Sequence, residues 1–281
     1  MSYPKEPNYY ALDIPVRRRI RNVDEYRTLF SHAPKGAICG EASPWYLFSY
    51  QAVPAILKDN PRARFIACLR NPVDMFVSLH GQELFNQEAD EKPDPEEAWA
   101  RQASLQPLRE GDKVTSLLPN YRDVCSLGRQ AERLLSRVGR ERTHFVLFDD
   151  IEKDPRSVYE ATLKFLGLES DGRTDFVVHN RRKAHRFPAL SRFLMRPPPP
   201  FDRVKSVLIR AILSVNPRPG NIYELGLLSK SRPQAVLRPE FRNELGAHFS
   251  DQISLLERLT GRDLSAWRAK PAVTSCSYNF S

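Results

Sequence analysis

The stretch from Arg64 to Gln82, RFIACLRNPVDMFVSLHGQ, decides the fold. Its first part, Arg64 to Leu69, is an apolar run with the length and composition of a buried strand. Asn71 and Pro72 come next, and asparagine at the N-cap with proline at the first helical position is a usual start for a helix. Apolar residues then recur at helical spacing. The stretch therefore predicts a strand, a short turn and a helix.

The same alternation of strand and helix continues on both sides of this stretch. Upstream, a short apolar run over Ala37 to Gly40 precedes a helix whose apolar residues extend from Trp45 to Leu57. Downstream, helical spacing over Leu127 to Val138 precedes a second buried strand, His144 to Phe148. A further helix has its cap and its closing glycine at the two ends of Asp154 to Gly167. Strands that alternate with helices predict an α/β fold with a parallel central sheet flanked by helices.

We expect a single domain over residues 1–269 and a tail over 270–281. The clearest compositional break is the proline-rich run RPPPP, which begins a stiff connection over about residues 196–220. After this connection, apolar residues at helical spacing predict a helix over 238–260. An isolated amphipathic helix is marginally stable in water, so we expect this helix to pack back on the core.

The charge balance of the chain is basic. Lysine and arginine total 43 against 34 acidic residues, which gives a net charge of +9 and a pI of about 9.5. This balance fits either an anionic ligand or an ordinary solvated surface. The charge is also the only support for a nucleic-acid partner, which we do not expect, because the chain has no zinc-finger, RNP or basic-helix signature. We expect no transmembrane segment, because no apolar stretch approaches roughly 20 residues.

The four cysteines indicate the compartment. They form no CxxC pair and no zinc-like spacing, so we expect no metal site. Cys39 and Cys68 lie in apolar, strand-like runs, where we expect buried free thiols. Free thiols persist in reducing compartments, and the opening residues MSYPKEPNYY have no signal-peptide pattern. We therefore expect a cytoplasmic protein.

Arg70 and Ser78 are the first candidates for a ligand site. In an open parallel sheet, ligands bind beyond the carboxyl ends of the strands, and Arg70 follows the first predicted strand. A helix N-terminus with free N–H groups comes directly after it. Ser78 lies about two turns along that helix. A guanidinium and a hydroxyl so placed can hold one phosphate, although each alone fits a solvated surface residue better.

Further candidates lie before and after this pair. In KEPNYY, Lys5 and Glu6 are typical of an ordinary exposed ion pair. The functional alternative is that Glu6 accepts a proton from the hydroxyl of an acceptor. GEASPWYL predicts a turn from strand to helix at the carboxyl edge of the sheet. His80 and Gln82 follow Ser78 on its helix, and Gln82 shares its face. The basic residues of the run 181–186 fit a solvated face, with an anionic ligand as the alternative.

Taken together and in order, these stretches resemble the sulfotransferase domain family, in particular bacterial members similar to heparan sulfate sulfotransferases. Each stretch is weak alone, whereas the ordered set is fairly specific. The resemblance implies a sulfotransferase fold that is similar to P-loop NTPases. The matching stretches, which extend from Lys5 to Trp267, are KEPNYY, GEASPWYL, RFIACLRNPVDMFVSLHGQ, HFVLFDDIEKDPRSVYEATLKFLGL and LERLTGRDLSAW.

The resemblance also implies an activity. Family members move a sulfuryl group from 3′-phosphoadenosine 5′-phosphosulfate (PAPS) to a hydroxyl or amine, and carbohydrate is the acceptor that we expect first. Sulfuryl transfer, like phosphoryl transfer, depends on positioning and electrostatics, so no metal is expected. The implied roles are Glu6 as general base, Arg70 and Ser78 as ligands of the cofactor's 3′-phosphate, and Gln82 as a residue near the acceptor. We also expect Lys5 and His80 to bind the acceptor.

The sequence departs from the family pattern in two places. Ala42 stands where the heparan enzymes usually have lysine, so any help from that amine is absent. Family members also open with a strand and a phosphate loop resembling P-K-x-G-T-T, whereas only four residues precede Lys5 here. We expect the first strand and the loop to be missing from the chain as numbered. Three explanations are open: a start placed too late, a genuine remnant, or completion of the site by another chain. The intact remaining motifs favour the first.

The alternative function is a catalytically inactive, truncated sulfotransferase-like protein that binds nucleotide or acidic polysaccharide. A missing phosphate loop favours this alternative, because the amides and the lysine of the loop would hold the 5′-phosphosulfate. Ligand binding without transfer would distinguish it from the enzyme.

Overall fold

The computed structural model divides the chain into two compact units. One unit comprises Met1–Phe76, Asp94–Phe176 and Leu237–Ser281, and the other comprises Val77–Pro93 and Val177–Val236. The described residues are 2, 5–15, 20, 22–86, 94–103, 105, 109–111, 120–177, 183–185, 229–231 and 236–268. The predicted connection over 196–220 and the tail over 270–281 lie outside them.

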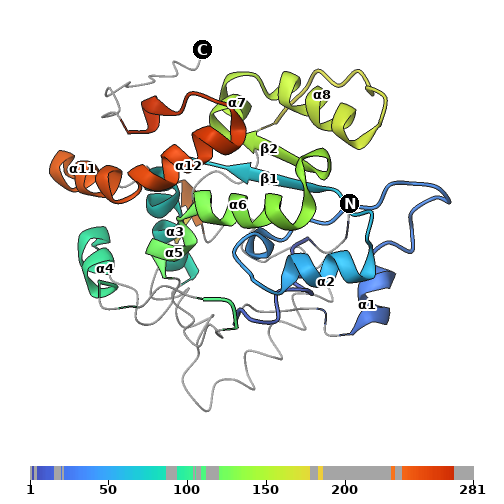
Figure 1. Ribbon diagram of the computed structural model, residues 1–281, viewed down its shortest axis with the longest axis horizontal. Helices are drawn as coiled ribbons and strands as arrows, with labels where there is room; N and C mark the ends of the chain where they lie inside the picture. Colours follow the sequence, from blue (N-terminus) through green and yellow to red (C-terminus); the bar gives the residue numbers. More distant parts are fainter. Residues whose placement is uncertain are drawn as a thin grey trace. The chain divides into compact units, whose positions relative to one another are not determined.

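The centre of the first unit is a parallel pair of strands, β1 (Phe65–Leu69) and β2 (Thr143–Leu147). In their register, Ala67 lies opposite Phe145 and Leu69 lies opposite Leu147. Figure 1 shows the two strands side by side. Both strands match the predicted ones to within one residue, and their parallel pairing confirms the predicted α/β class.

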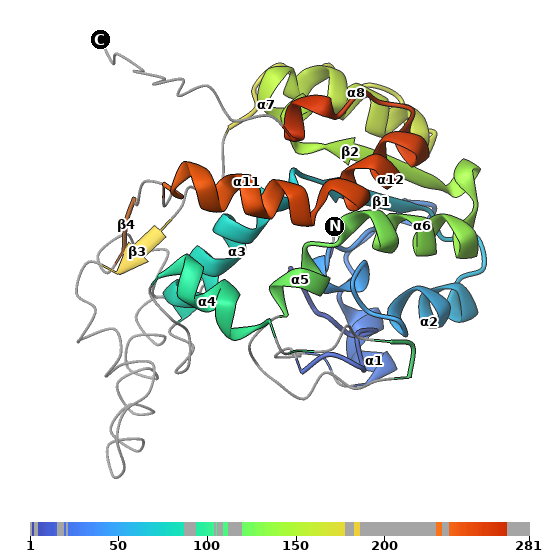
Figure 2. The same ribbon diagram turned by 60° about the vertical axis from the view of Figure 1, so that its left-hand side comes forward.

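One face of this sheet is covered by α6 (Leu127–Val138) and α12 (Ser250–Thr260), which pack side by side (Figure 2). Their approach is close, because a Cβ on Gly128 would lie 2.6 Å from the backbone oxygen of Gln252. The shared core between strands and helices contains Leu69, Leu127, Ala131, Leu147, Ile253, Leu256, Leu264 and Trp267, with Val53, Ala67, Leu134 and Val138 in an adjoining cluster.

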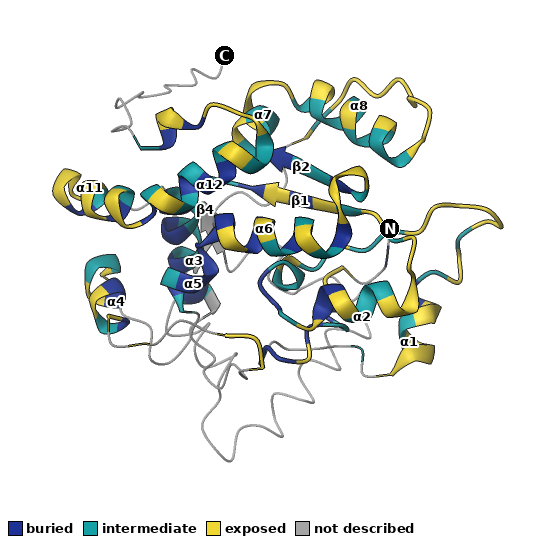
Figure 3. Cartoon of the chain, in the orientation of Figure 1, coloured by how far each residue is buried: buried dark blue, intermediate teal, exposed yellow. Residues whose placement is uncertain are grey.

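The other face of the sheet is covered unevenly. The helix α8 (Pro155–Leu166) packs against β2, and the His144 ring stacks on Phe165 with centroids 5.1 Å apart. On β1, exposed and buried residues alternate, so that part of the strand is exposed in Figure 3. Cys68 lies on this exposed side, and Cys39 is exposed as well. The prediction of two buried thiols is therefore wrong, because β1 is covered on one side only and residues 37–39 are exposed and form no strand.

The helix predicted over Trp45 to Leu57 is interrupted. It divides into η1 (Pro44–Tyr46), a 3-10 turn, and α2 (Ala52–Asp59). The cause is a network in which the Ser49 hydroxyl donates to Asp13, which is 36 residues away in sequence, and accepts from the Ala52 N–H at 2.9 Å. Competition of a serine side chain with the helical backbone is a known reason for a helix to start anew.

The helix predicted over 238–260 is also two helices, α11 (Pro239–His248) and α12, and they meet at Phe249. Phe249 is fully buried, with its ring 5.7 Å from that of Trp99, so burial of this ring sets the break. The end of α12 at Gly261, with φ of 67°, agrees with the sequence. In the core, Ile253 and Leu256 of α12 lie with Leu69 and Leu147 of the two strands.

The remaining elements of the first unit surround this core. An aromatic cluster joins α3, α4, α5 and α11, where the ring of Phe76 meets Trp99, Tyr121 and Phe241 edge to face. The helix α3 continues into the second unit. The bounds of these elements are α1 (Val23–Thr28), α3 (Pro72–Asn86), α4 (Pro95–Arg101), α5 (Tyr121–Val124), η2 (Arg140–Arg142), α7 (Phe148–Lys153) and η3 (Ser265–Trp267).

In the second unit, β3 (Lys183–His185) pairs antiparallel with β4 (Ser229–Ser231). β3 takes up the middle of the basic run 181–186, whose other members lie outside the described residues. Among the helices that the structure describes, none has the length and apolar character needed to cross a membrane.

Candidate functional site

The junction between β1 and α3 holds the first predicted site residue, Arg70. Arg70 is half-buried directly after β1, and its guanidinium lies 4.5 Å from the centre of the Phe148 ring. Phe148 begins α7 directly after β2. Because the strands are parallel, both residues mark the carboxyl edge of the sheet, where open α/β folds bind ligands.

Asn71 fixes the start of α3 at this junction. It is 6% exposed, and its Oδ1 accepts from the Val73 N–H at 2.9 Å, which caps the first turn of the helix. Its Nδ2 donates to the carbonyl of Trp267 at 3.1 Å, so the cap is fastened to the C-terminal part of the first unit. The strand, the cap and proline at the first helical position follow the sequence prediction.

Three predicted site residues lie farther along α3, in the second unit. Ser78 is half-buried, His80 is 2% exposed, and Gln82 is exposed. Ser78 and Gln82 are four residues apart in the helix and therefore share a face. Of the three, Gln82 is the residue most open to solvent. Their roles stay predictions.

Lys5 and Glu6 lie on a strained turn in the first unit. Both side chains are exposed, and Glu6 and Asn8 have left-handed backbone conformations, with φ of 55° and 50°. Pro7 between them is fully buried. The Nδ2 of Asn8 donates to the carbonyl of Glu6 at 3.2 Å, and the N–H of Asn8 donates to the hydroxyl of Ser43 at 3.1 Å. The turn is thus fastened to the GEASP segment.

Glu41 is linked to this turn through Ser43. The Ser43 hydroxyl donates to Glu41 Oε2 at 3.0 Å, whereas Glu41 Oε1 is buried and has no hydrogen-bond partner among the described residues. Burial raises the pKa of Glu41, and this effect outweighs that of the nearby hydroxyls of Tyr46, Ser43 and Tyr26, which lower the pKa. The site therefore contains a carboxyl group that is costly to ionise, within a few ångströms of the turn that carries Glu6.

Tyrosines pack around the same network. Tyr9 stacks on Tyr26 with centroids 4.7 Å apart, and Tyr10 meets Tyr26 and Tyr46 edge to face. The Tyr46 hydroxyl accepts from the Tyr10 N–H at 3.2 Å, and the Tyr10 hydroxyl donates to Asp59 at 3.0 Å. Burial is the largest cause that raises the pKa of Tyr10, Tyr26 and Tyr46, so all three stay neutral hydrogen-bond donors. The aromatic residues of KEPNYY thus anchor the turn.

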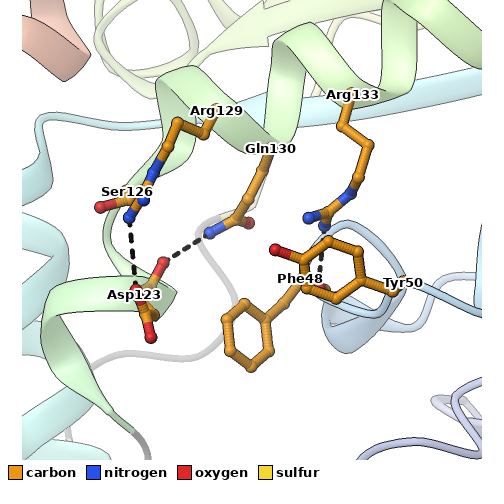
Figure 4. A pocket seen from close by; sticks show the side chains of 7 residues that line it. All are labelled: Phe48, Tyr50, Asp123, Ser126, Arg129, Gln130 and Arg133. Carbon is orange, nitrogen blue, oxygen red and sulfur yellow. Dashed lines mark hydrogen bonds and ion pairs between the residues drawn. The ribbon is translucent and has the colours of Figure 1, made fainter. Parts of the chain in front are cut away.

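A small pocket of the first unit lies elsewhere, beside α6, and contains none of the predicted site residues (Figure 4). Its cationic side chains are engaged within the protein. Arg133 donates to the carbonyls of Leu47 and Phe48 at 2.7 and 2.8 Å, and Arg129 pairs with Asp123 at 3.3 Å. The pocket is therefore a packed polar junction rather than a ligand site. It is lined by Phe48, Tyr50, Asp123, Ser126, Arg129, Gln130 and Arg133.

The pattern of GEASPWYL predicted a turn but indicated no role for Glu41, Ser43 or Tyr46. The available signal was a carboxylate next to a serine and two aromatic residues, which fits a buried acid held by hydroxyl groups. In the part of the chain that the structure describes, no group of three or more histidine, cysteine, aspartate or glutamate side chains could hold a metal ion.

Comparison with known proteins gives two findings. Residues 47–186 match the family model of the sulfotransferase domain. A crystal structure of a sulfotransferase from Alicyclobacillus acidocaldarius aligns with a TM-score of 0.64 and 23% sequence identity, over 95% of this chain and 87% of that chain. No curated protein sequence matches. The likeness confirms the predicted α/β sulfotransferase fold. The family match includes Arg70, Ser78, His80 and Gln82, whereas Lys5 and Glu6 precede it.

Proposed function

The chain belongs to the sulfotransferase domain family through residues 47–186, and on that premise we propose that it is a PAPS-dependent sulfotransferase. It transfers the sulfuryl group of PAPS to a hydroxyl or amine of an acceptor. Carbohydrate is the acceptor class that the resemblance to heparan enzymes favours. The observation that carries the proposal is the junction of β1 and α3, because it places Arg70 at the carboxyl edge of the sheet, within the matched segment.

The donor is held through its 3′-phosphate. The guanidinium of Arg70 can donate two parallel hydrogen bonds to this phosphate, and the hydroxyl of Ser78 donates a further one. The capped N-terminus of α3 contributes its N–H groups and the positive end of its dipole, both of which favour an anion.

The transfer itself needs one base. The acceptor oxygen or nitrogen attacks sulfur, the new bond to sulfur forms, and the bond from sulfur to the 5′-phosphate oxygen breaks. The electron pair of that bond leaves with 3′-phosphoadenosine 5′-phosphate (PAP). Glu6 accepts the proton that the acceptor loses, while the exposed side chains of Lys5 and Gln82 contact the acceptor. The side chain of His80 is buried, so we do not place it against the acceptor. No metal is required, because positioning and electrostatics supply the catalysis.

The compartment that we propose is the cytoplasm. Cys39, Cys68 and Cys125 are free thiols, and free thiols are typical of reducing compartments.

Binding of PAP to the full chain, measured by titration calorimetry, tests the donor site. We expect Arg70→Ala to weaken PAP binding about 10- to 100-fold, because a charge-assisted hydrogen-bond pair is lost. The matched control is Arg62→Ala, which removes an exposed arginine from the turn before β1 and leaves PAP binding unchanged. A wild-type chain that does not bind PAP would overturn the proposal.

Transfer of radiolabelled sulfate from PAPS to chemically desulfated heparin tests the reaction. Label in the polysaccharide supports the enzyme, and loss of transfer in Arg70→Ala with retained folding assigns it to this site. Binding of PAP without transfer to heparin or to smaller hydroxyl and amine acceptors would instead favour the inactive binding protein.

A further inference from the structure

The turn that carries Glu6 is costly to form. Glu6 and Asn8 both have positive φ, a conformation that asparagine adopts comparatively easily and glutamate only at a cost. The side chain of Asn8 is 7% exposed, and its Oδ1 is buried and accepts no hydrogen bond from the described residues. Strained dihedrals and buried unpartnered acceptors persist only where the surroundings impose them, and they concentrate at functional sites.

A hydrogen-bonded chain imposes this conformation. The N–H of Asn8 donates to the Ser43 hydroxyl at 3.1 Å, and that hydroxyl donates in turn to Glu41 Oε2 at 3.0 Å. The Nδ2 of Asn8 donates to the carbonyl of Glu6 at 3.2 Å, which closes the turn. Because the Ser43 hydroxyl accepts on one side and donates on the other, the carboxylate of Glu41 fixes its direction.

The anchor of this chain is itself half-buried. Glu41 Oε2 accepts from the Ser43 hydroxyl, while Glu41 Oε1 is buried and accepts no hydrogen bond from the described residues. The Tyr46 hydroxyl accepts from the Tyr10 N–H, so the residue pair that follows the turn is tied to the segment that carries Glu41 and Ser43. The turn is therefore connected to the 41–46 segment from both of its ends, whereas the side chain of Glu6 stays exposed.

We propose that Glu41 and Ser43 are positioning residues for the carboxylate of Glu6, which they act on through Asn8. The inference rests on the proposed function, since Glu6 is the general base of that reaction. Neither residue touches the acceptor. They hold the backbone of the turn in a conformation that it would otherwise leave, and this conformation aims the Glu6 side chain at the acceptor proton.

The test compares Ser43→Ala with Ser43→Thr in the full chain. Alanine removes the bridging hydroxyl, and threonine retains it. Hydrogen exchange reports the turn directly, because the Asn8 N–H is the donor to Ser43. We expect its exchange to become about tenfold faster in Ser43→Ala and to return in Ser43→Thr. The matched control is Ser31→Ala, which removes an exposed hydroxyl that bonds the carbonyl of Thr28.

Turnover is then measured as kcat per PAP-binding site, with PAPS as donor and desulfated heparin as acceptor. We expect Ser43→Ala to lower this kcat about 10- to 100-fold at unchanged PAP affinity, because a small misplacement of a catalytic group has effects of this size. Glu41→Gln is expected to lower it in the same direction. A merely structural role would reduce the number of binding sites and leave kcat per site unchanged.

The outcomes separate the two proposals. Faster exchange with reduced kcat per site, both restored by threonine, supports the positioning role. An active wild-type chain whose kcat per site survives Ser43→Ala, or whose Asn8 exchange does not respond, overturns the positioning role alone. A wild-type chain that transfers no sulfate to any acceptor overturns the proposed function, and the positioning role with it.

Discussion

The junction at Arg70 and the turn at Glu6 are built in opposite ways. At the junction, a strand ends, Asn71 caps the next helix, and the buried amide has a donor and an acceptor partner. At the turn, two residues have positive φ, and Asn8 keeps a buried oxygen without a partner among the described residues. The junction follows ordinary rules for helix starts, whereas the turn departs from ordinary backbone preferences.

This difference matches the two proposed roles, which are binding of the donor at the junction and proton transfer at the turn. A site that binds an anion can use an unstrained helix N-terminus, because the free N–H groups are present in any capped helix. A base must point in one direction, and a strained turn held by Ser43 can supply a direction that a regular element does not. We therefore expect changes at the junction to act on PAP affinity and on stability, and changes at the turn to act on kcat.

The largest effect that separates the regions is expected from Glu6→Gln. Loss of a general base typically lowers kcat about 10²- to 10⁴-fold, whereas PAP binding should not change because Glu6 does not hold the donor. The measurement is kcat per PAP-binding site together with PAP affinity by calorimetry. Glu25→Gln, in the exposed first turn of α1, serves as control. Unchanged turnover in Glu6→Gln would remove Glu6 from the mechanism.

The contrast also explains what could be predicted from the sequence. The pattern from Arg64 to Gln82 predicted β1, the cap at Asn71 and α3, because strand composition, capping and helical spacing are local signals. The two predicted helices that proved interrupted failed for non-local reasons. Asp13 binds Ser49 before α2, and the ring of Phe249 is buried against Trp99 between α11 and α12.

The turn could not be predicted, because its conformation depends on distant residues. KEPNYY gave a candidate base, but nothing in it indicates positive φ at Glu6 or Asn8. The partner that holds it, Ser43, is 35 residues away in sequence. Likewise, the sequence gives no measure of the burial that raises the pKa of Glu41. The family resemblance therefore gave Glu6 as a candidate, whereas the residues that hold its turn follow from long-range contacts that the sequence does not show.

The next effect concerns the stability of the junction. Asn71→Ala removes the cap on Val73 and leaves the buried carbonyl of Trp267 without its donor. We expect a loss of about 2–3 kcal/mol in the free energy of unfolding, from the cap and from the unpaired carbonyl. Urea unfolding measures it, with Asn60→Ala at an exposed helix end as control. A loss equal to that of the control would show that the cap does not stabilise the junction.

A smaller effect, about 1–3 kcal/mol, is expected from Gly128→Ala, because its Cβ would overlap the backbone of Gln252. The separation of α6 from α12 would also disturb Trp267, which packs in the same core and binds Asn71. PAP affinity should fall, while exchange of the Asn8 N–H should stay unchanged. Gly81→Ala, where an added Cβ meets nothing within 4 Å, is the control. Faster Asn8 exchange in Gly128→Ala would show that the two regions are not independent.

The smallest effect, within about 1 kcal/mol, is expected from Glu41→Gln, and its sign depends on pH. Burial in the folded protein raises the pKa of Glu41 above its ordinary value of 4.5. The folded state therefore holds the proton of Glu41 to a higher pH than the unfolded chain does. The unfolded chain releases its proton first as pH rises. The contribution of Glu41 to stability is therefore full below about pH 4.5 and is lost as pH rises through the folded-state pKa.

Glutamine does not ionise, so the Glu41→Gln variant does not lose this stability as pH rises. Relative to wild type, the variant should be more stable at pH 7.5 than at pH 4.5 in urea unfolding, while its kcat per site falls. Glu132→Gln, which replaces an exposed glutamate on α6, is the matched control. A variant that gains relative stability yet loses turnover would separate the positioning of Glu6 from the stability of the fold. Parallel losses of stability and turnover would instead assign Glu41 to the fold alone, and the strained turn would then be a structural feature like the junction.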